Sequence, residues 1–210
     1  MNALILVDLQ NDFLPGGALA VPEGDRILPL VNRLQPHFDR VVATQDWHPA
    51  DHGSFAANHP GRAPGEFVDL NGLQQILWPA HCVQGTIGAD FAPGLDQQLW
   101  SGVFQKGTNP TIDSYSGFHD NGHRQATHLD DDLRGSQVTD VYVAGLATDY
   151  CVKYTVLDAL MLGFETHLLE DACRGVELEA GDVRRAVEAM ETAGAKIIAT
   201  KDILTDEGAL

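Results

Sequence analysis

The sequence predicts a single α/β domain over residues 1–210, in which a mostly parallel central sheet carries helices on both faces in three layers (α/β/α). Two observations lead to this prediction. Strand-like and helix-like segments alternate along the chain, and the strand-like segments are nearly continuous in apolar residues, as in parallel sheets with both faces covered. A length of 210 residues suffices for one large domain with its own core.

The first half of the chain predicts two strands and one helix before this alternation is interrupted. Residues 3–7 are an apolar run that fits a buried strand, residues 26–38 place apolar side chains at helical spacing, and residues 40–44 form a second strand. Residues 46–99 are rich in Gly, Pro, His, Asn and Asp. A connection this long in a compact domain is functional or disordered, and its tryptophan-containing patches favour an ordered, functional loop region.

The alternation resumes in the second half. A short third strand at 102–105 precedes a polar helix at 125–134, and a buried strand at 138–144 leads through Gly145 into a helix at 152–160. The last predicted elements are a strand at 165–169, a helix at 179–193 and a strand at 196–199.

The charge balance is strongly acidic, with 30 Asp and Glu against 13 Lys and Arg. Nucleic acids and anionic membranes are disfavoured as partners because both need basic patches, and no apolar run approaches membrane-spanning length. A neutral small-molecule substrate is compatible with this charge. The sequence leaves open whether the chain forms a homo-oligomer.

The cysteines favour a reduced, cytoplasmic protein, because they are odd in number and the N-terminus lacks the basic region of a signal peptide. Cys151 is the most informative. It lies in the predicted first turn of a helix that follows a strand, and Thr148 or Asp149 can cap that helix. Backbone N–H groups and the helix dipole there favour the thiolate and an oxyanion. The alternative is a buried, inert cysteine.

Four predicted strands end in reactive side chains, at Asp8, at Asp46 and His48, at Lys106 and at the Cys151 turn. Ligands of open parallel sheets bind beyond the carboxyl ends of the strands, so these groups are expected to share one crevice. Alone, Asp8 fits a strand-end cap and Lys106 a solvated cation. Next to a thiol, the carboxyl group is suited to protonate a leaving amine, and the ammonium favours the thiolate.

A second set of side chains suits one divalent metal ion. Asp46, His48 and His52 follow the pattern Asp-x-His-x-x-x-His, and His81 lies further along the same loop region. One carboxylate and three imidazoles fit zinc, with iron and manganese as alternatives. The competing interpretation is a set of surface histidines in a polar loop.

The other histidines and cysteines are assigned no chemistry. Six histidines are interpreted as surface residues of polar segments, namely His37, His59, His119, His123, His128 and His167. Cys82 and Cys173 are interpreted as buried structural thiols.

Together these residues resemble the nicotinamidases, also called pyrazinamidases, of the isochorismatase-like cysteine hydrolases, and the resemblance runs nearly end to end. In the first half it rests on ALILVDLQNDF at 3–13, PGGAL at 15–19, TQDWH at 44–48, HGSF at 52–55 and WPAHCV at 78–83. In the second half it rests on KG at 106–107, DSYSGF at 113–118, GLATDYCV at 145–152 and EDACRG at 170–175.

The resemblance implies a role for each matching residue. It implies a catalytic triad of Asp8, Lys106 and Cys151, and an oxyanion hole from the N–H groups of Ala147 and Cys151 after a cis peptide bond. It implies metal ligation by Asp46, His48, His52 and His81, with Ser54 supporting the metal site. The aromatic residues implied to hold the substrate ring are Phe13, Trp78 and Tyr115.

The reaction implied by the resemblance is hydrolysis of nicotinamide to nicotinate and ammonia through a thioester, as part of pyridine nucleotide salvage. Pyrazinamide is the related substrate. The alternative enzyme is another amide or carbamoyl hydrolase of the same superfamily, although the aromatic set favours a flat ring. The alternative from a different class is a metal- or ligand-binding protein without turnover.

Overall fold

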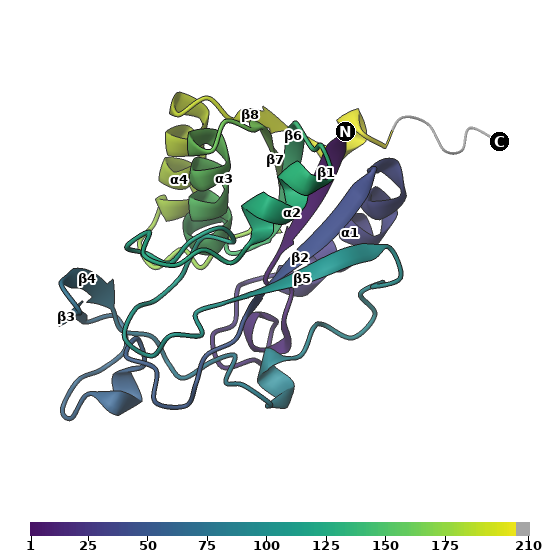
Figure 1. The fold of residues 1–210 in the computed structure, drawn as a ribbon. Coiled ribbons are helices and arrows are strands. Elements are labelled where there is room, and N and C mark those ends of the chain that lie inside the picture. The colour runs from purple at the N-terminus through teal and green to yellow at the C-terminus, as the bar shows by residue number, and fades with distance from the viewer. Residues whose placement is uncertain (205–210) are drawn as a thin grey trace.

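The computed structural model describes residues 1–204, and a six-stranded sheet forms its centre (Figure 1). In spatial order the strands are β5 (Trp100–Lys106), β2 (Arg40–Asp46), β1 (Asn2–Val7), β6 (Asp140–Leu146), β7 (Glu165–Arg174) and β8 (Lys196–Ile198). Every neighbouring pair is parallel. The prediction of a mostly parallel sheet is therefore confirmed.

Helices cover both faces of this sheet, and β1 shows why. Its alternate side chains enter two separate cores, with Leu4 and Leu6 in one and Ile5 in the other. The first core includes Val31 of α1 (Leu28–Leu34). The second core includes residues of α2 (Leu129–Gly135), α3 (Lys153–Met161) and α4 (Asp182–Thr192). The result is the predicted three-layer arrangement.

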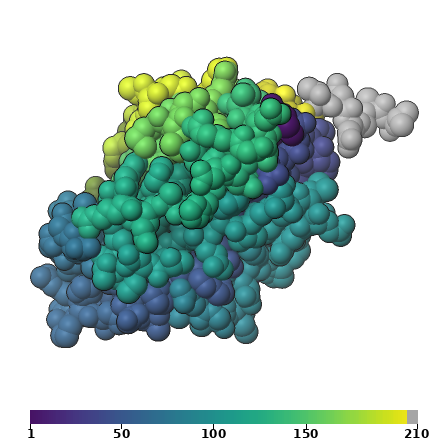
Figure 2. All heavy atoms as spheres, in the orientation of Figure 1, coloured from purple at the N-terminus to yellow at the C-terminus, as the bar shows by residue number. Residues whose placement is uncertain are grey.

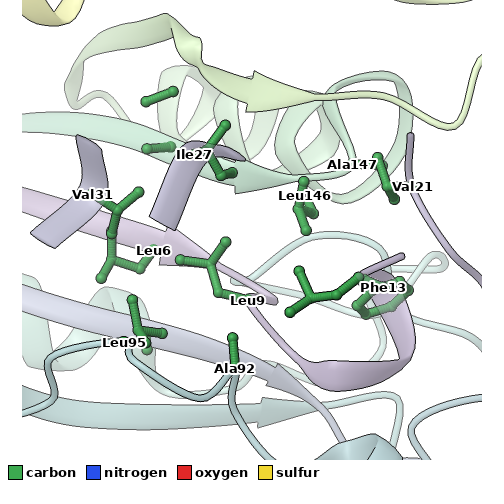
Figure 3. Close-up of a cluster of buried hydrophobic side chains, with 14 of the residues drawn as sticks. Leu6, Leu9, Phe13, Val21, Ile27, Val31, Ala92, Leu95, Leu146 and Ala147 are labelled. Atoms are coloured by element: carbon green, nitrogen blue, oxygen red, sulfur yellow. The ribbon is translucent and has the colours of Figure 1, made fainter. Parts of the chain in front are cut away.

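The first core extends to the edge of the sheet formed by the carboxyl ends of the strands, where parallel sheets bind ligands. Figure 3 shows Leu6, Leu9, Phe13 and Leu146 in one apolar layer with Ala147. Phe13 and Ala147 also line the pocket described below. The packing that stabilises this face therefore also fixes part of the pocket wall.

Three predicted helices are shorter than expected, including the one predicted at 179–193, which spans only Asp182–Thr192. The helix predicted at 125–134 begins only at Leu129, because the Asp120 carboxylate accepts hydrogen bonds from the backbone N–H groups of Arg124 and Gln125 and holds them in a loop. The helix predicted at 26–38 is α-helical only from 28 to 34 and continues as a 3₁₀ turn at Gln35–His37.

The loop region contains a small element that the sequence analysis did not predict. Strands β3 (Phe67–Leu70) and β4 (Leu73–Ile76) form an antiparallel hairpin outside the main sheet. The turn between them places Asn71 and Gly72 at positive φ, as short hairpins require. Among residues 1–204, no helix is long and apolar enough to cross a membrane.

The strand order indicates that a ligand-binding crevice lies between the ends of β1 and β6. From β1 the chain builds outwards through β2 to β5 and then returns to add β6 on the other side of β1. The sheet therefore reverses its winding direction between β1 and β6, and α/β proteins bind ligands at such switch points. Asp8 directly follows β1, and the Cys151 turn follows β6.

Candidate active site

The ammonium group of Lys106, at the end of β5, connects the groups that the sequence analysis placed at the strand ends. Its Nζ lies 2.8 Å from Asp8 Oδ2, 2.5 Å from Asp46 Oδ1 and 3.4 Å from Cys151 Sγ. It also donates to the carbonyl of Ser114 at 3.0 Å. Burial alone would lower the pKa of Lys106, but the adjacent carboxylates raise that pKa well above its usual value. The ammonium therefore stays charged inside the protein.

Asp8 is held beside Lys106 by the neighbouring strand. The Thr44 hydroxyl lies 2.6 Å from Asp8 Oδ1 and accepts a hydrogen bond from the Asp8 backbone N–H at 3.2 Å. The Asp8 side chain is fully buried, and burial raises its pKa. A carboxyl group with a raised pKa that touches a fixed cation is suited to exchange protons during a reaction.

Cys151 lies within a helical turn, but its environment differs from the expectation. The turn at Thr148–Val152 is π-helical and leads into α3. No side chain caps it; the Asp149 carboxylate instead accepts hydrogen bonds from the backbone N–H groups of Val176 and Glu177. Burial raises the pKa of the Cys151 thiol well above its usual value, even though Lys106 lowers it. Burial and the neighbouring carboxylates therefore oppose the thiolate that the sequence analysis expects here, whereas Lys106 favours it.

The Asp46 carboxylate lies between Lys106 and two of the predicted histidine ligands, His48 and His81. Its Oδ1 contacts Lys106, and its Oδ2 lies 3.4 Å from His48 Nε2 and 3.6 Å from His81 Nε2. Gln10 fixes the backbone there by bonding both the N–H and the carbonyl of Asp46 at 2.8 Å. Although burial would raise the pKa of Asp46, Lys106 and His48 lower it well below its usual range. This carboxylate is therefore ionised and available to a cation.

The three predicted histidine ligands are each anchored through one ring nitrogen. Nδ1 of His48 lies 2.9 Å from the Gly107 carbonyl, Nδ1 of His81 lies 2.8 Å from the Pro79 carbonyl, and Nδ1 of His52 lies 2.7 Å from Ser54 Oγ. His48 and His81 face carbonyl oxygens, so each ring donates from Nδ1 and keeps Nε2 as a free ligand atom. Nδ1 of His52 instead also accepts a hydrogen bond from the Ser54 backbone N–H at 3.2 Å.

The buried ring nitrogen of His52 tests whether these residues fit a metal ion. Its Nε2 is buried and has no hydrogen-bond partner among the described residues. Burial lowers the pKa of His52 to about 4, so the ring is neutral at pH 7, as a ligand must be. His48 belongs to two overlapping groups of potential ligands, with Asp46 and His81 in one and with His52 and Asp113 in the other. The donor set fits a borderline divalent ion.

A pocket connects this donor set with the thiol. Its lining residues are Phe13, Leu19, Asp46, His48, Trp78, His81, Asp113, Tyr115, Ala147, Tyr150, Cys151 and Val176. The three predicted ring-binding residues are all among them. Tyr115 is fixed there because its Oη accepts hydrogen bonds from Trp78 Nε1 at 3.2 Å and from Gln75 Nε2 at 3.0 Å. The peptide bond between Leu146 and Ala147 is cis, as the resemblance implies.

Four pocket residues were not assigned a role from the sequence; one of them, Leu19, lies in the motif at 15–19. Asp113 is buried next to His48 and His52; it lies in the motif at 113–118, whose charged first residue was the available signal. Tyr150 precedes Cys151, and its ring packs edge-on against Trp78 with centroids 4.8 Å apart. Val176 reaches the pocket from the loop after β7, and no sequence pattern indicated it.

The remaining cysteines and histidines lie away from the pocket lining. Cys82 and Cys173 are buried free thiols, and burial raises the pKa of both, that of Cys173 to about 12. Two of the histidines interpreted as surface residues, His119 and His123, converge on Asp158.

Comparison with known proteins agrees with this geometry. Residues 2–202 match the family model described as the isochorismatase domain. The nicotinamidase of Escherichia coli strain K12 is 52% identical over 205 residues, which cover 96% of each chain.

Solved structures give the same relationship. A nicotinamidase/pyrazinamidase from Acinetobacter baumanii superposes with a TM-score of 0.94 at 46% identity, covering 97% of this chain and 98% of that one. A pyrazinamidase from Pyrococcus horikoshii, solved in complex with zinc, superposes with a TM-score of 0.77 at 42% identity, covering 94% and 98%. The chain therefore belongs to the isochorismatase family and, within it, to the nicotinamidase group of amide hydrolases.

Proposed function

We propose that this enzyme hydrolyses nicotinamide to nicotinate and ammonia through a thioester on Cys151, that it also accepts pyrazinamide, and that it serves pyridine nucleotide salvage. One observation carries the chemical part of the proposal. Lys106 contacts both Asp8 and Cys151, and Cys151 lines a pocket that is also lined by Asp46, His48 and His81. The amide of a bound substrate would then face Cys151, and its ring would lie near Asp46, His48 and His81.

The first half of the reaction follows from the protonation states. The Cys151 thiol gives its proton to the Asp8 carboxylate as the sulfur attacks the carboxamide carbon. The N–H groups of Ala147 and Cys151 stabilise the resulting oxyanion. Asp8 then passes the proton to the leaving nitrogen, the C–N bond breaks, and ammonia departs from a thioester. Lys106 stays charged and holds Asp8 against the sulfur.

The second half uses the same groups again. Asp8 removes a proton from a water molecule, the hydroxide attacks the thioester carbonyl, and the C–S bond breaks. The proton returns to the sulfur, and nicotinate is released. The same carboxyl group thus acts as base and then acid in both halves.

We assign a structural and substrate-positioning role to one divalent ion, with zinc as the first choice and iron or manganese as alternatives. Asp46, His48, His52 and His81 would hold it, and Ser54 would orient His52. When bound, the ion supplies a Lewis-acid position for the pyridine nitrogen. Phe13, Trp78 and Tyr115 pack around the ring, and this orients the carboxamide towards Cys151.

The test is ammonia release from nicotinamide by protein of measured metal content, with Cys151→Ala alongside. We expect turnover by the wild type and a loss of at least about 1,000-fold in the variant, because the nucleophile is removed. Cys173→Ala is the matched control, since it removes another buried thiol outside the pocket, and it should keep its activity. Turnover of aliphatic amides or carbamoyl compounds without turnover of nicotinamide would overturn the substrate assignment.

A further inference from the structure

A second group of metal-ligand side chains lies outside the pocket. His119 Nδ1 lies 3.3 Å from Asp158 Oδ2, and His123 Nε2 lies 3.3 Å from Asp158 Oδ1. We infer that His119, His123 and Asp158 form a second binding site for a divalent transition metal ion, independent of the site at Asp46.

The spacing of the donor atoms fits one ion. The donor atoms of all three residues lie within 4.8 Å of one another. Bonds of about 2.0–2.1 Å to a tetrahedral zinc ion place neighbouring ligand atoms about 3.3–3.4 Å apart. Each imidazole nitrogen lies 3.3 Å from a different oxygen of Asp158, so each has this spacing to one atom of the carboxylate. Two imidazoles and one carboxylate are the donor types that zinc, cobalt and nickel accept.

Hydrogen bonds to Asp120 hold the backbone of the loop that carries both histidines. The Asp120 carboxylate accepts hydrogen bonds from three backbone N–H groups, those of Gly122, Arg124 and Gln125, and so closes the loop that carries both histidines. Within that loop the two imidazole rings are stacked, with centroids 4.8 Å apart and planes 9° from parallel. These hydrogen bonds fix the loop backbone without involving the ligands. Because imidazole lone pairs lie in the ring planes, one of the two stacked rings would rotate when both bind the same ion.

The third ligand comes from a rigid helix. Asp158 lies on α3, and its side chain is 9% exposed, whereas those of His119 and His123 are 19% and 46% exposed. A buried carboxylate beneath two more accessible imidazoles leaves the cluster open to solvent on one side. The loop passes beside α3 in Figure 1, and its teal-green segment reaches the surface of the face shown in Figure 2.

The cluster at Asp158 differs from another cluster of potential ligands in lacking a cationic lysine partner among the described residues. Asp140, Glu165 and His167 also bring three donor atoms together, but Lys196 pairs with Glu165 there and already supplies a cation. The only salt-bridge partners of Asp158 among the described residues are the two imidazoles. A metal ion would use both imidazoles and the carboxylate at once.

An ion at this site would connect the loop, α3 and the wall of the active-site pocket. The Asn121 side chain, between the two histidines in sequence, accepts a hydrogen bond from the Tyr115 backbone N–H at 3.0 Å. The Tyr115 ring stacks on Tyr154 of α3, with centroids 5.4 Å apart. The expected effect of occupancy is therefore a more stable protein, without a direct role in the reaction.

The experiment titrates metal-free full-length protein with Co²⁺, followed by visible absorption, and with Zn²⁺, followed by equilibrium dialysis. The variants are His123→Asn and, as matched control, His128→Asn. Both histidines have positive φ (53° and 71°), a conformation that Asn tolerates. Among residues 1–204, His128 contacts one carboxylate, that of Asp131, and belongs to no three-residue cluster of potential ligands.

We expect His123→Asn to bind one equivalent fewer than the wild type, or to bind it at least tenfold more weakly, and His128→Asn to match the wild type. His119→Gln should show the same loss as His123→Asn. Identical stoichiometry and affinity in the wild type and His123→Asn would overturn the inference.

His52→Ala separates this site from the proposed active-site ion. Loss of one equivalent in His52→Ala and of a different one in His123→Asn supports both sites. Loss in His123→Asn with no change in His52→Ala supports the second site and counts against the first. Loss in His52→Ala alone overturns the second site. Equal thermal unfolding of all metal-free variants shows that the differences do not come from misfolding.

Discussion

At the scale of single residues, Lys106 organises the site through charge. Its ammonium lies between Asp8 and Asp46 and touches the sulfur of Cys151. Two carboxylates this close would repel each other without it, and burial would drive at least one of them to the neutral form. Because Lys106 stays charged, the Asp46 carboxylate can bind a metal cation while the Asp8 carboxylate exchanges protons.

The proposed reaction gives Asp8 a specific task. Burial raises the pKa of Cys151, and this increases the need for a nearby base to take the thiol proton during attack. The donor atoms of Asp8 and Cys151 lie within 4.8 Å of each other. Asp8 is the neighbouring carboxylate that is not turned towards the histidines, which is why it, and not Asp46, is the base in the proposed reaction.

Ser54 provides a residue-scale prediction, because it touches the metal site only through His52. Ser54→Ala removes the oxygen 2.7 Å from His52 Nδ1 and should weaken metal binding by about 10- to 100-fold. Metal affinity measured by competition with a chelator checks this. Ammonia release at saturating metal should recover to a large extent. Unchanged affinity would show that Ser54 does not orient the ligand.

At the scale of secondary structure, the junction between β6 and the Cys151 turn depends on close backbone packing. Gly145 has φ +130°, and a Cβ built on it would lie 2.2 Å from the carbonyl oxygen of Val7 on β1. Gly145 pairs with Val7 in the sheet, one residue before Asp8. The absence of a side chain therefore lets the two strands that carry Asp8 and Cys151 approach each other.

Gly145→Ala should destabilise the protein by more than about 4 kcal/mol, since it combines a backbone clash with an unfavourable φ. Urea unfolding and the yield of folded protein measure this. Gly135→Ala is the matched control, because no atom lies within 4 Å of its built Cβ and its φ is not positive. The control should be neutral or up to about 1 kcal/mol more stable. Equal stability of both variants would contradict the packing argument.

At the scale of the whole molecule, the site combines segments from across the chain. The ends of β1, β2 and β5 supply Asp8, Asp46 and Lys106, and the turn after β6 supplies Cys151. His52 and His81 come from the loop region, which contains few regular elements besides the β3–β4 hairpin. An ion bound by these residues would fasten that loop to the sheet.

Removal of the ion should therefore lower the stability of the folded protein. Chelator-treated protein is expected to unfold at a lower temperature, and added Zn²⁺ should restore the original value. The difference corresponds to about 2.7 kcal/mol when free metal is 100 times its dissociation constant. Calorimetry in the His123→Asn background isolates the active-site ion, and hydrogen exchange should show the largest change between residues 47 and 81. No response to chelation would count against the ion's structural role.

Much of the fold could be predicted from the sequence because it depends on local patterns. Apolar runs located all six strands of the main sheet, and the motifs after them located Asp8, Lys106 and Cys151 at its edge. Helix ends were less predictable. The loop closed by Asp120 delays α2 until Leu129 through hydrogen bonds that helical spacing does not reveal.

The sequence by itself determined the α/β alternation, the family and the set of side chains able to do the chemistry, since these follow from residue types and their spacing. Only the tertiary structure decided the environment of the Cys151 thiol, because the groups that bury it and the charges around it come from distant segments. It also decided that Val176 lines the pocket and that His119 and His123 converge on Asp158. Proximity between residues far apart in the chain depends on packing, and no local pattern encodes it.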